Sequence, residues 1–200
     1  MTLWQGQPHA QQSANQPQYD SGGQLLVPQG FETWTFVGSN LGLGYAKGVT
    51  AVTQGESRRP AEQNYHNIYI NPVGYSQYVA TGTFPEKTML VMDVYEAAQK
   101  EIGSAGRPSV LNDGTFNGKR RRIEVAVKDA NRPNRREDPQ HLSIQGWAYY
   151  AFDFVTPGRL QPGAGPFDDS ACYACHVDHA GDDNVWVQFY PTLRRVKQPE

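Results

Sequence analysis

Residues 88–97 read Thr-Met-Leu-Val-Met-Asp-Val-Tyr-Glu-Ala, and this run of β-branched and aromatic residues predicts a strand. Two similar runs follow at residues 122–128 and 146–155, and Gly, Pro, Asn and Asp separate them. Short strands between such turn residues are typical of an antiparallel sheet. We therefore expect a mainly β (α+β) fold, with an antiparallel β-sheet and a few short helices.

The segment before these strands predicts a strand and a helix. Residues 66–70 alternate in polarity and stop at Asn71, which Pro72 follows. Proline favours the first turn of a helix, so a helix is expected from Pro72 to about Thr81. Gly82 is expected to end it.

The N-terminal part divides into a tail and a first helix. Residues 1–24 are rich in Gln, Pro, Ser, Asn and Gly, and we expect them to form a disordered polar tail. The folded domain then covers residues 25–200. Within residues 28–37, Phe31 and Trp34 lie at helical spacing, which predicts a short amphipathic helix.

Length and composition restrict the class of protein. The chain has 200 residues, of which 38% are hydrophobic and 12% aromatic, enough for one core. Its net charge of −2 lacks the basic excess that nucleic-acid binding requires. No apolar run approaches the roughly 20 residues that span a bilayer, so no membrane partner is expected.

The segment Cys172-Tyr173-Ala174-Cys175-His176 has the Cys-x-x-Cys-His spacing of c-type haem attachment. Two thiols at this spacing can reach the two vinyl groups on one edge of a porphyrin, while the adjacent imidazole binds the iron axially. We therefore expect one haem c per chain, bound through Cys172, Cys175 and His176, with His176 as a metal ligand. Haem attachment of this kind implies export, so we expect a periplasmic protein whose signal peptide is absent from this sequence.

Two other interpretations of the motif are a zinc site and a redox pair. Zinc would use Cys172, Cys175, His176 and His179, although Cys2His2 sites separate their ligand pairs by about a dozen residues. A thioredoxin-like pair would need a βαβ unit, which this sequence does not predict. In the haem interpretation, His179 is a surface histidine or contacts a propionate.

The segments around the haem motif resemble the cytochrome P-460 family, which includes cytochrome c′-β. Residues 183–194, Asp-Asn-Val-Trp-Val-Gln-Phe-Tyr-Pro-Thr-Leu-Arg, look like the closing signature of that family. Residues 31–38, 68–72 and 82–85 are similar, in order, to its opening helix, its first strand and turn, and the lead into its second strand. Val127-Lys128-Asp129 and Gly146-Trp147 continue the series, so the resemblance covers about residues 25–195.

The resemblance implies a predominantly antiparallel β fold, usually a homodimer, that holds one haem with a proximal histidine. Relatives that oxidise hydroxylamine carry a lysine linked covalently to the porphyrin. The c′-β branch instead has an apolar distal face and binds nitric oxide.

The position of the family's cross-linking lysine falls on Met92 in this chain. Lys87 lies five residues earlier, which is about 17 Å along a strand and on its opposite face, so it cannot simply substitute. Met92 is expected on the distal side of the haem, where it either packs against the porphyrin or binds the iron through its thioether. Met89, on the other face of the strand, is expected in the core.

His66 aligns with an arginine that hydroxylamine-oxidising relatives carry near the distal pocket. It is a candidate haem contact that could hydrogen-bond a ligand or coordinate the iron, and an exposed strand histidine is the alternative. Asp168 and Asp169 could accept protons in hydroxylamine chemistry, but acidic loop residues are usually only solvated.

Eight of the eighteen basic residues fall within positions 119–136. They could steer an acidic redox partner protein, or form a solvated hairpin in which neighbouring acids dilute their charge. The expected function is a periplasmic mono-haem c-type cytochrome without the lysine link, acting in electron transfer or nitric oxide binding. The alternative is an enzyme that oxidises hydroxylamine or detoxifies nitric oxide.

Overall fold

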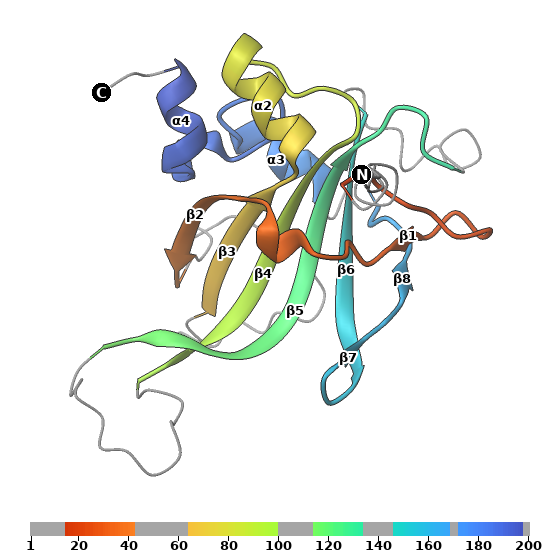
Figure 1. Cartoon of the computed structure of the whole chain (residues 1–200), viewed down its shortest axis with the longest axis vertical. Coiled ribbons are helices and arrows are strands. Elements are labelled where there is room, and N and C mark those ends of the chain that lie inside the picture. The colour runs from red at the N-terminus through yellow and green to blue at the C-terminus, as the bar shows by residue number, and fades with distance from the viewer. Residues whose placement is uncertain (1–14, 43–63, 100–113, 134–145, 169–171, 198–200) are drawn as a thin grey trace, which may run out of the picture.

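A computed structural model describes residues 15–42, 64–99, 114–133, 146–168 and 172–197. Six strands form one sheet in the order β2-β3-β4-β5-β6-β7, so each strand pairs with its neighbours in the chain (Figure 1). Every pairing is antiparallel. The strands are β2 (Thr35–Leu41), β3 (Asn64–Ile70), β4 (Thr88–Ala98), β5 (Phe116–Lys128), β6 (Trp147–Thr156) and β7 (Arg159–Leu160).

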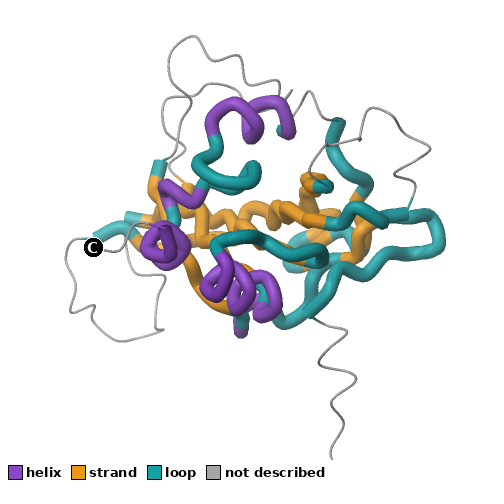
Figure 2. The backbone as a smooth tube through the Cα atoms, turned by 90° about the horizontal axis from the view of Figure 1, so that it is seen from above, coloured by secondary structure: helices purple, strands orange, loops and turns teal. Residues whose placement is uncertain are grey.

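A two-stranded sheet and several short helices complete the fold. β1 (Leu25–Leu26) pairs with β8 (Gly163–Ala164), also antiparallel. The helices are α2 (Pro72–Thr81), α3 (Tyr173–His179), α4 (Pro191–Lys197) and the single 3-10 turns η1 (Phe31–Thr33) and η3 (Val187–Phe189). Figure 2 shows the strands running through the middle of the molecule, with helices and loops on either side. The expected mainly β fold with an antiparallel sheet and a few short helices is confirmed.

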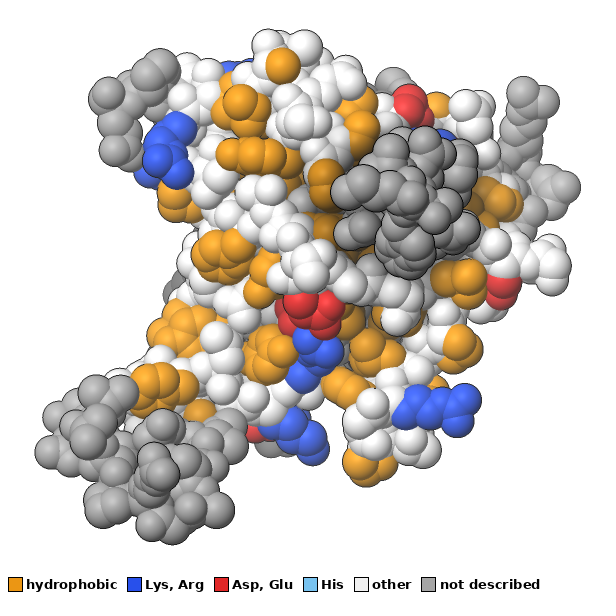
Figure 3. Space-filling view, viewed as in Figure 1, with side chains coloured by type: hydrophobic (Ala, Val, Ile, Leu, Met, Phe, Trp, Pro, Cys, Tyr) orange, Lys and Arg blue, Asp and Glu red, His pale blue; other side chains and the backbone are white. Residues whose placement is uncertain are grey.

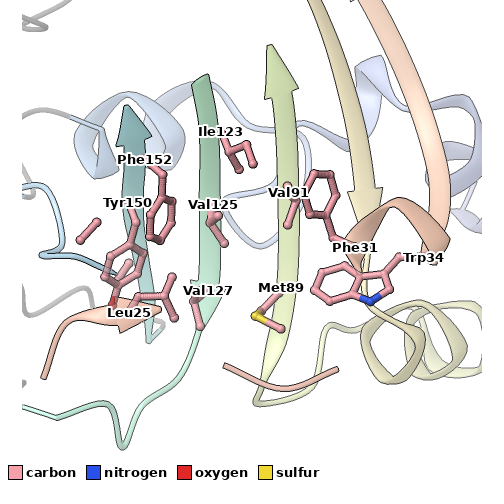
Figure 4. Packing of buried hydrophobic residues seen from close by; sticks show 12 residues of the cluster. Leu25, Phe31, Trp34, Met89, Val91, Ile123, Val125, Val127, Tyr150 and Phe152 are labelled. Atoms are coloured by element: carbon pink, nitrogen blue, oxygen red, sulfur yellow. The ribbon is translucent and has the colours of Figure 1, made fainter. Parts of the chain in front are cut away.

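The sheet buries both of its faces because side chains alternate along each strand. One face carries Met89, Val91, Val125 and Val127, on which Leu25, Phe31 and Trp34 pack (Figure 4). The opposite face carries a second cluster, to which the helices and the C-terminal segment contribute. Its buried members are Val37, Ile68, Ile70, Tyr78, Phe84, Leu90, Trp147, Tyr149, Val185, Val187 and Leu193.

The prediction of an amphipathic helix over residues 28–37 is wrong. Only Phe31–Thr33 forms a helical turn, and strand β2 begins at Thr35. The β-branched Thr35 and Val37 favour extended backbone. Phe31 and Trp34 are both buried in the first cluster. Val37 is buried in the second cluster, on the opposite face of the sheet.

The helix expected after Pro72 is confirmed as α2. Gly82 follows it with φ 72° and donates its N–H to the carbonyl of Tyr78 at 2.8 Å, which is a left-handed glycine cap. Met89 is 1% exposed in the first cluster, as expected. No helix of the described residues is long and apolar enough to cross a membrane.

The predicted tail ended at residue 24, but residues 15–24 contact the domain. Tyr19 donates its hydroxyl to the buried Asp129 carboxylate at 3.1 Å, and Trp34 donates its indole N–H to the side chain of Asn15 at 2.9 Å. The composition of this stretch is polar, yet specific side chains hold it against the first cluster. Residues 1–14 lie outside the described residues.

Candidate functional site

Helix α3 presents the Cys-x-x-Cys-His motif in one helical turn. The N–H of His176 donates to the carbonyl of Cys172 at 3.1 Å. Residues three and four positions apart share a helix face, so Cys172, Cys175 and His176 lie on one side of α3. Cys172 packs against the second cluster, and both cysteines are free thiols. The motif therefore borders the apolar face of the sheet.

The His176 imidazole is held from both ring nitrogens. Its Nδ1 lies 2.7 Å from the backbone carbonyl of Asn184, and its Nε2 lies 3.0 Å from the indole N–H of Trp186. A carbonyl only accepts and an indole N–H only donates, so Nδ1 carries the proton and Nε2 the lone pair. Burial lowers the pKa of His176 from 6.5 to about 4, which keeps the ring neutral.

Aromatic rings enclose the same imidazole. The centroid of Tyr149, on β6, lies 4.4 Å from that of His176, and the centroid of Trp186 lies 5.2 Å away in an edge-on arrangement. A neutral imidazole whose Nδ1 is tied to a carbonyl is the usual form of a metal-binding histidine. Binding a metal at Nε2 would exchange the hydrogen bond from Trp186 for the metal bond.

Met92 lies on the face of the sheet that α3 borders. It pairs with Ile68 of β3 and with Glu124 of β5, and its half-buried side chain packs against the second cluster, as Cys172 does. Leu90 of the same strand face is buried in that cluster. The surroundings of Met92 are thus mainly apolar, apart from the Glu124 carboxylate, which forms an ion pair with Arg122.

His66 lies on the same face, two residue pairs farther along the β3–β4 ladder. It pairs with Val94 of β4, while Met92 pairs with Ile68, so His66 and Met92 are diagonal neighbours on adjacent strands. Diagonal neighbours on one sheet face lie about 7–8 Å apart. The His66 side chain is half-buried.

Two lysines at the start of β4 and the end of β5, within the described residues, are engaged away from Met92. Lys87 precedes β4 and bonds Asp129 at 2.6 Å, while Lys128 bonds Asp183 at 2.7 Å and the carbonyl of Phe84 at 2.9 Å. Neither ammonium is directed to the position of Met92.

Burial raises the pKa of both thiols. Burial, the nearby Glu124 carboxylate and Cys175 raise the pKa of Cys172 to about 12, and burial also raises the pKa of Cys175. A reactive Cys-x-x-Cys pair needs a lowered thiol pKa. Among the described residues, no three His, Cys, Asp or Glu side chains gather as a group that could hold a metal ion. His179 is exposed, as the haem interpretation expects of it.

The remaining candidates contribute little to this region. Asp168 is exposed, and Asp169 lies outside the described residues. Two arginines of β5 form ion pairs: Arg120 with Asp93 and Glu32, and Arg121 with Glu96. Basic side chains are also scattered over the described surface seen in Figure 3. The solvated-hairpin alternative accounts for these contacts, while Arg135 and Arg136 lie outside the described residues.

Sequence reasoning missed the residues that hold the imidazole. The Asn184 carbonyl and Trp186 reach His176 from 8 and 10 residues farther along the chain, Tyr149 reaches it from β6, and Glu124 pairs with Met92. One local signal was available: Asp183-Asn184 between polar and apolar residues is a dipeptide that favours a tight turn.

The residues present fit a haem. His176 offers Nε2 as a lone-pair donor, two thiols share its helix face, and a largely apolar sheet face lies beside them. In addition, the buried side-chain Nδ2 of Asn184 has no acceptor among the described residues, as a donor awaiting an anionic group would. Fold and site together define a haem-binding β-sheet protein.

The comparison with protein families agrees with this class. The sequence model of the family described as cytochrome P460 matches residues 28–187, which include the Cys-x-x-Cys-His motif and most of the chain. The chain belongs to the cytochrome P460 family and is a haem cytochrome. No curated protein matches the sequence.

Proposed function

We propose that the protein is a mono-haem c-type cytochrome, without a lysine link to the porphyrin, that acts in electron transfer. Cys172 and Cys175 would form the two thioether bonds, and the Nε2 of His176 would bind the iron. When bound, the haem supplies an iron that takes up and releases single electrons. The observation that supports this proposal is the protonation of His176, whose Nδ1 bond to Asn184 leaves Nε2 as the donor atom.

Met92 is the proposed distal residue. A thioether is a soft ligand that pairs with histidine in electron-transfer cytochromes and raises their potential. The family resemblance puts Met92 at the position of the cross-linking lysine, and its neighbours Ile68 and Leu90 are buried apolar residues. His66, its diagonal neighbour, is proposed as a second contact on the distal side.

Nitric oxide binding is the second candidate, and the apolar surroundings of Met92 favour it. If Met92 only packs in the pocket, the iron keeps an open position for a diatomic ligand. The enzyme alternative needs a proton acceptor beside that position, and Glu124 is the carboxylate that pairs with Met92 across the strands. Hydroxylamine turnover with an artificial electron acceptor tests this alternative.

The setting of the protein follows from the same proposal. Covalent haem attachment occurs outside the cytoplasm of bacteria, so we propose a periplasmic location. A homodimer and a redox partner protein are the proposed partners, on the basis of family resemblance.

The test compares absorption spectra of the wild-type protein with Met92→Ala and Met92→Leu. Leucine keeps the volume of methionine but has no sulfur, so it separates packing from ligation. Ligation predicts a low-spin spectrum with a thioether-to-iron band that both variants lose. A high-spin wild-type spectrum that shifts on adding nitric oxide, unchanged in Met92→Leu, would favour gas binding instead. Denatured wild-type protein that runs at the bare polypeptide mass would refute haem attachment altogether.

A further inference from the structure

The turn that follows α3 carries the hydrogen-bond partner of His176. Val185 donates its N–H to the carbonyl of Asp182 at 2.8 Å, and Asp182 donates to the carbonyl of Val185 at 3.3 Å. Between them, Asp183 has φ 44° and Asn184 has φ 60°. Two central residues with positive φ define a type I′ turn, which normally contains glycine. Contacts outside the turn are therefore expected to stabilise this conformation.

The side chain of Asp183, a central residue of this turn, contacts two strands of the sheet. Its carboxylate accepts hydrogen bonds from the ammonium of Lys128 on β5 at 2.7 Å and from the indole N–H of Trp147 on β6 at 3.2 Å. The two charged side chains are only 20% and 17% exposed. Partial shielding from water strengthens such an ion pair relative to a surface one.

Asp182 binds the helices from the other side of the turn. It accepts a hydrogen bond from the hydroxyl of Tyr78 on α2 at 3.1 Å and an ion pair from Lys197 on α4 at 2.5 Å. The turn is thus tied to two strands and two helices. Its backbone, including the Asn184 carbonyl, is fixed relative to the sheet face that carries Met92.

Two donors share the Asn184 carbonyl. The Nδ1 of His176 lies 2.7 Å from it, and the hydroxyl of Tyr149 lies 3.3 Å from it. A hydrogen bond from Nδ1 makes the imidazole a more basic ligand through Nε2. The second donor draws on the same oxygen, so it weakens the bond from His176.

We propose that Asp183, through its ion pair with Lys128, positions the Asn184 carbonyl and thereby sets how strongly His176 donates electron density to a metal. Tyr149 acts in the opposite sense by sharing the carbonyl. Asp183 and Tyr149 are positioning residues. This inference rests on the proposed function, in which His176 is the proximal haem ligand.

The test measures the midpoint potential of the haem-loaded protein by equilibration with a reference dye. Asp183→Asn removes the charge pair, weakens the Nδ1 bond and is expected to raise the potential, because a less basic imidazole stabilises ferric iron less. Tyr149→Phe removes the competing donor and is expected to lower it. Lys128→Arg keeps the charge pair and serves as the matched control, with the wild-type potential. We expect at least a threefold change in the redox equilibrium for each of the first two variants, about 28 mV at 59 mV per tenfold change.

The midpoint potential is expected to rise in Asp183→Asn and to fall in Tyr149→Phe, and these opposite shifts distinguish a positioning role from a merely structural one. Loss of a polar hydroxyl near the haem would by itself raise the potential, so a fall in Tyr149→Phe identifies the effect on the shared carbonyl. Haem-loaded Asp183→Asn at the wild-type potential would overturn the proposal. If Asp183→Asn does not load haem, Tyr149→Phe decides: a lowered potential supports the proposal and an unchanged or raised one overturns it. Failure of the proposed function is a different result, in which the wild-type protein itself carries no covalent haem.

Discussion

Lys87 offers a direct test of the proposal that it does not replace the cross-linking lysine of the family. It precedes β4 with a left-handed backbone, φ 67°, and its ammonium bonds the carboxylate of Asp129 at 2.6 Å. The Asp129 side chain is 1% exposed. Lys87→Met keeps a long side chain and the same backbone demand but removes the cation, so a buried carboxylate loses its charged partner.

The expected cost follows from the exposure of the two side chains. Breaking a buried ion pair costs about 3–5 kcal/mol. Lys87 is 38% exposed, and the Tyr19 hydroxyl and the Asn131 N–H still bond Asp129, so we expect about 2 kcal/mol. With a urea dependence of about 2 kcal/mol per M, the unfolding midpoint falls by about 1 M. The haem absorption bands are expected to stay unchanged.

The assay is urea unfolding followed by tryptophan fluorescence, together with the absorption spectrum of the folded variant. Asp129→Asn and the double variant complete a mutant cycle, in which the cost of Lys87→Met shrinks once the carboxylate is gone. A wild-type urea midpoint in Lys87→Met, or a change in its haem bands, would refute the assignment of Lys87 to Asp129.

Two further predictions concern the stability of the folded chain. In the haem-free chain, burial lowers the pKa of His176 from 6.5 to about 4, so the unfolded state binds more protons between these values. The contribution of neutral His176 to the free energy of unfolding is therefore complete above pH 6.5 and is lost as the pH drops to 4, by up to about 3 kcal/mol. His176→Gln is expected to flatten this part of a profile of urea midpoint against pH. An unchanged slope in this variant would contradict the prediction. Gly74→Ala places a Cβ 2.6 Å from Asn71 Oδ1 and 2.8 Å from Thr88 Cγ2, so the thermal midpoint should fall by an amount equivalent to about 1–3 kcal/mol. Gly165→Ala, with nothing within 4 Å, is the control, and equal midpoints for both variants would count against this packing.

Local chemistry explains what could be predicted before the structure. The haem motif needs only the spacing of Cys172, Cys175 and His176, since one helical turn brings them together. β4 was predictable from its β-branched and aromatic residues, and α2 because Pro72 and Gly82 mark its two ends.

Errors arose where distant contacts compete with local preference. Phe31 and Trp34 have helical spacing, yet the chain continues as an edge strand, since Thr35–Leu41 pairs with β3. Tyr19 lies in a polar stretch, but its bond to Asp129, 110 residues away, holds it on the domain.

The sequence by itself predicted the Cys-x-x-Cys-His motif as a haem site, strands β3 to β6 in outline and the face of β4 on which Met92 lies. Only the tertiary structure decided how His176 is oriented, because the Asn184 carbonyl, Tyr149 and Trp186 reach it from separate segments. The Lys128–Asp183 pair joins residues 55 positions apart. Such contacts depend on how strands and helices pack together, and packing is fixed by the whole chain rather than by any local pattern.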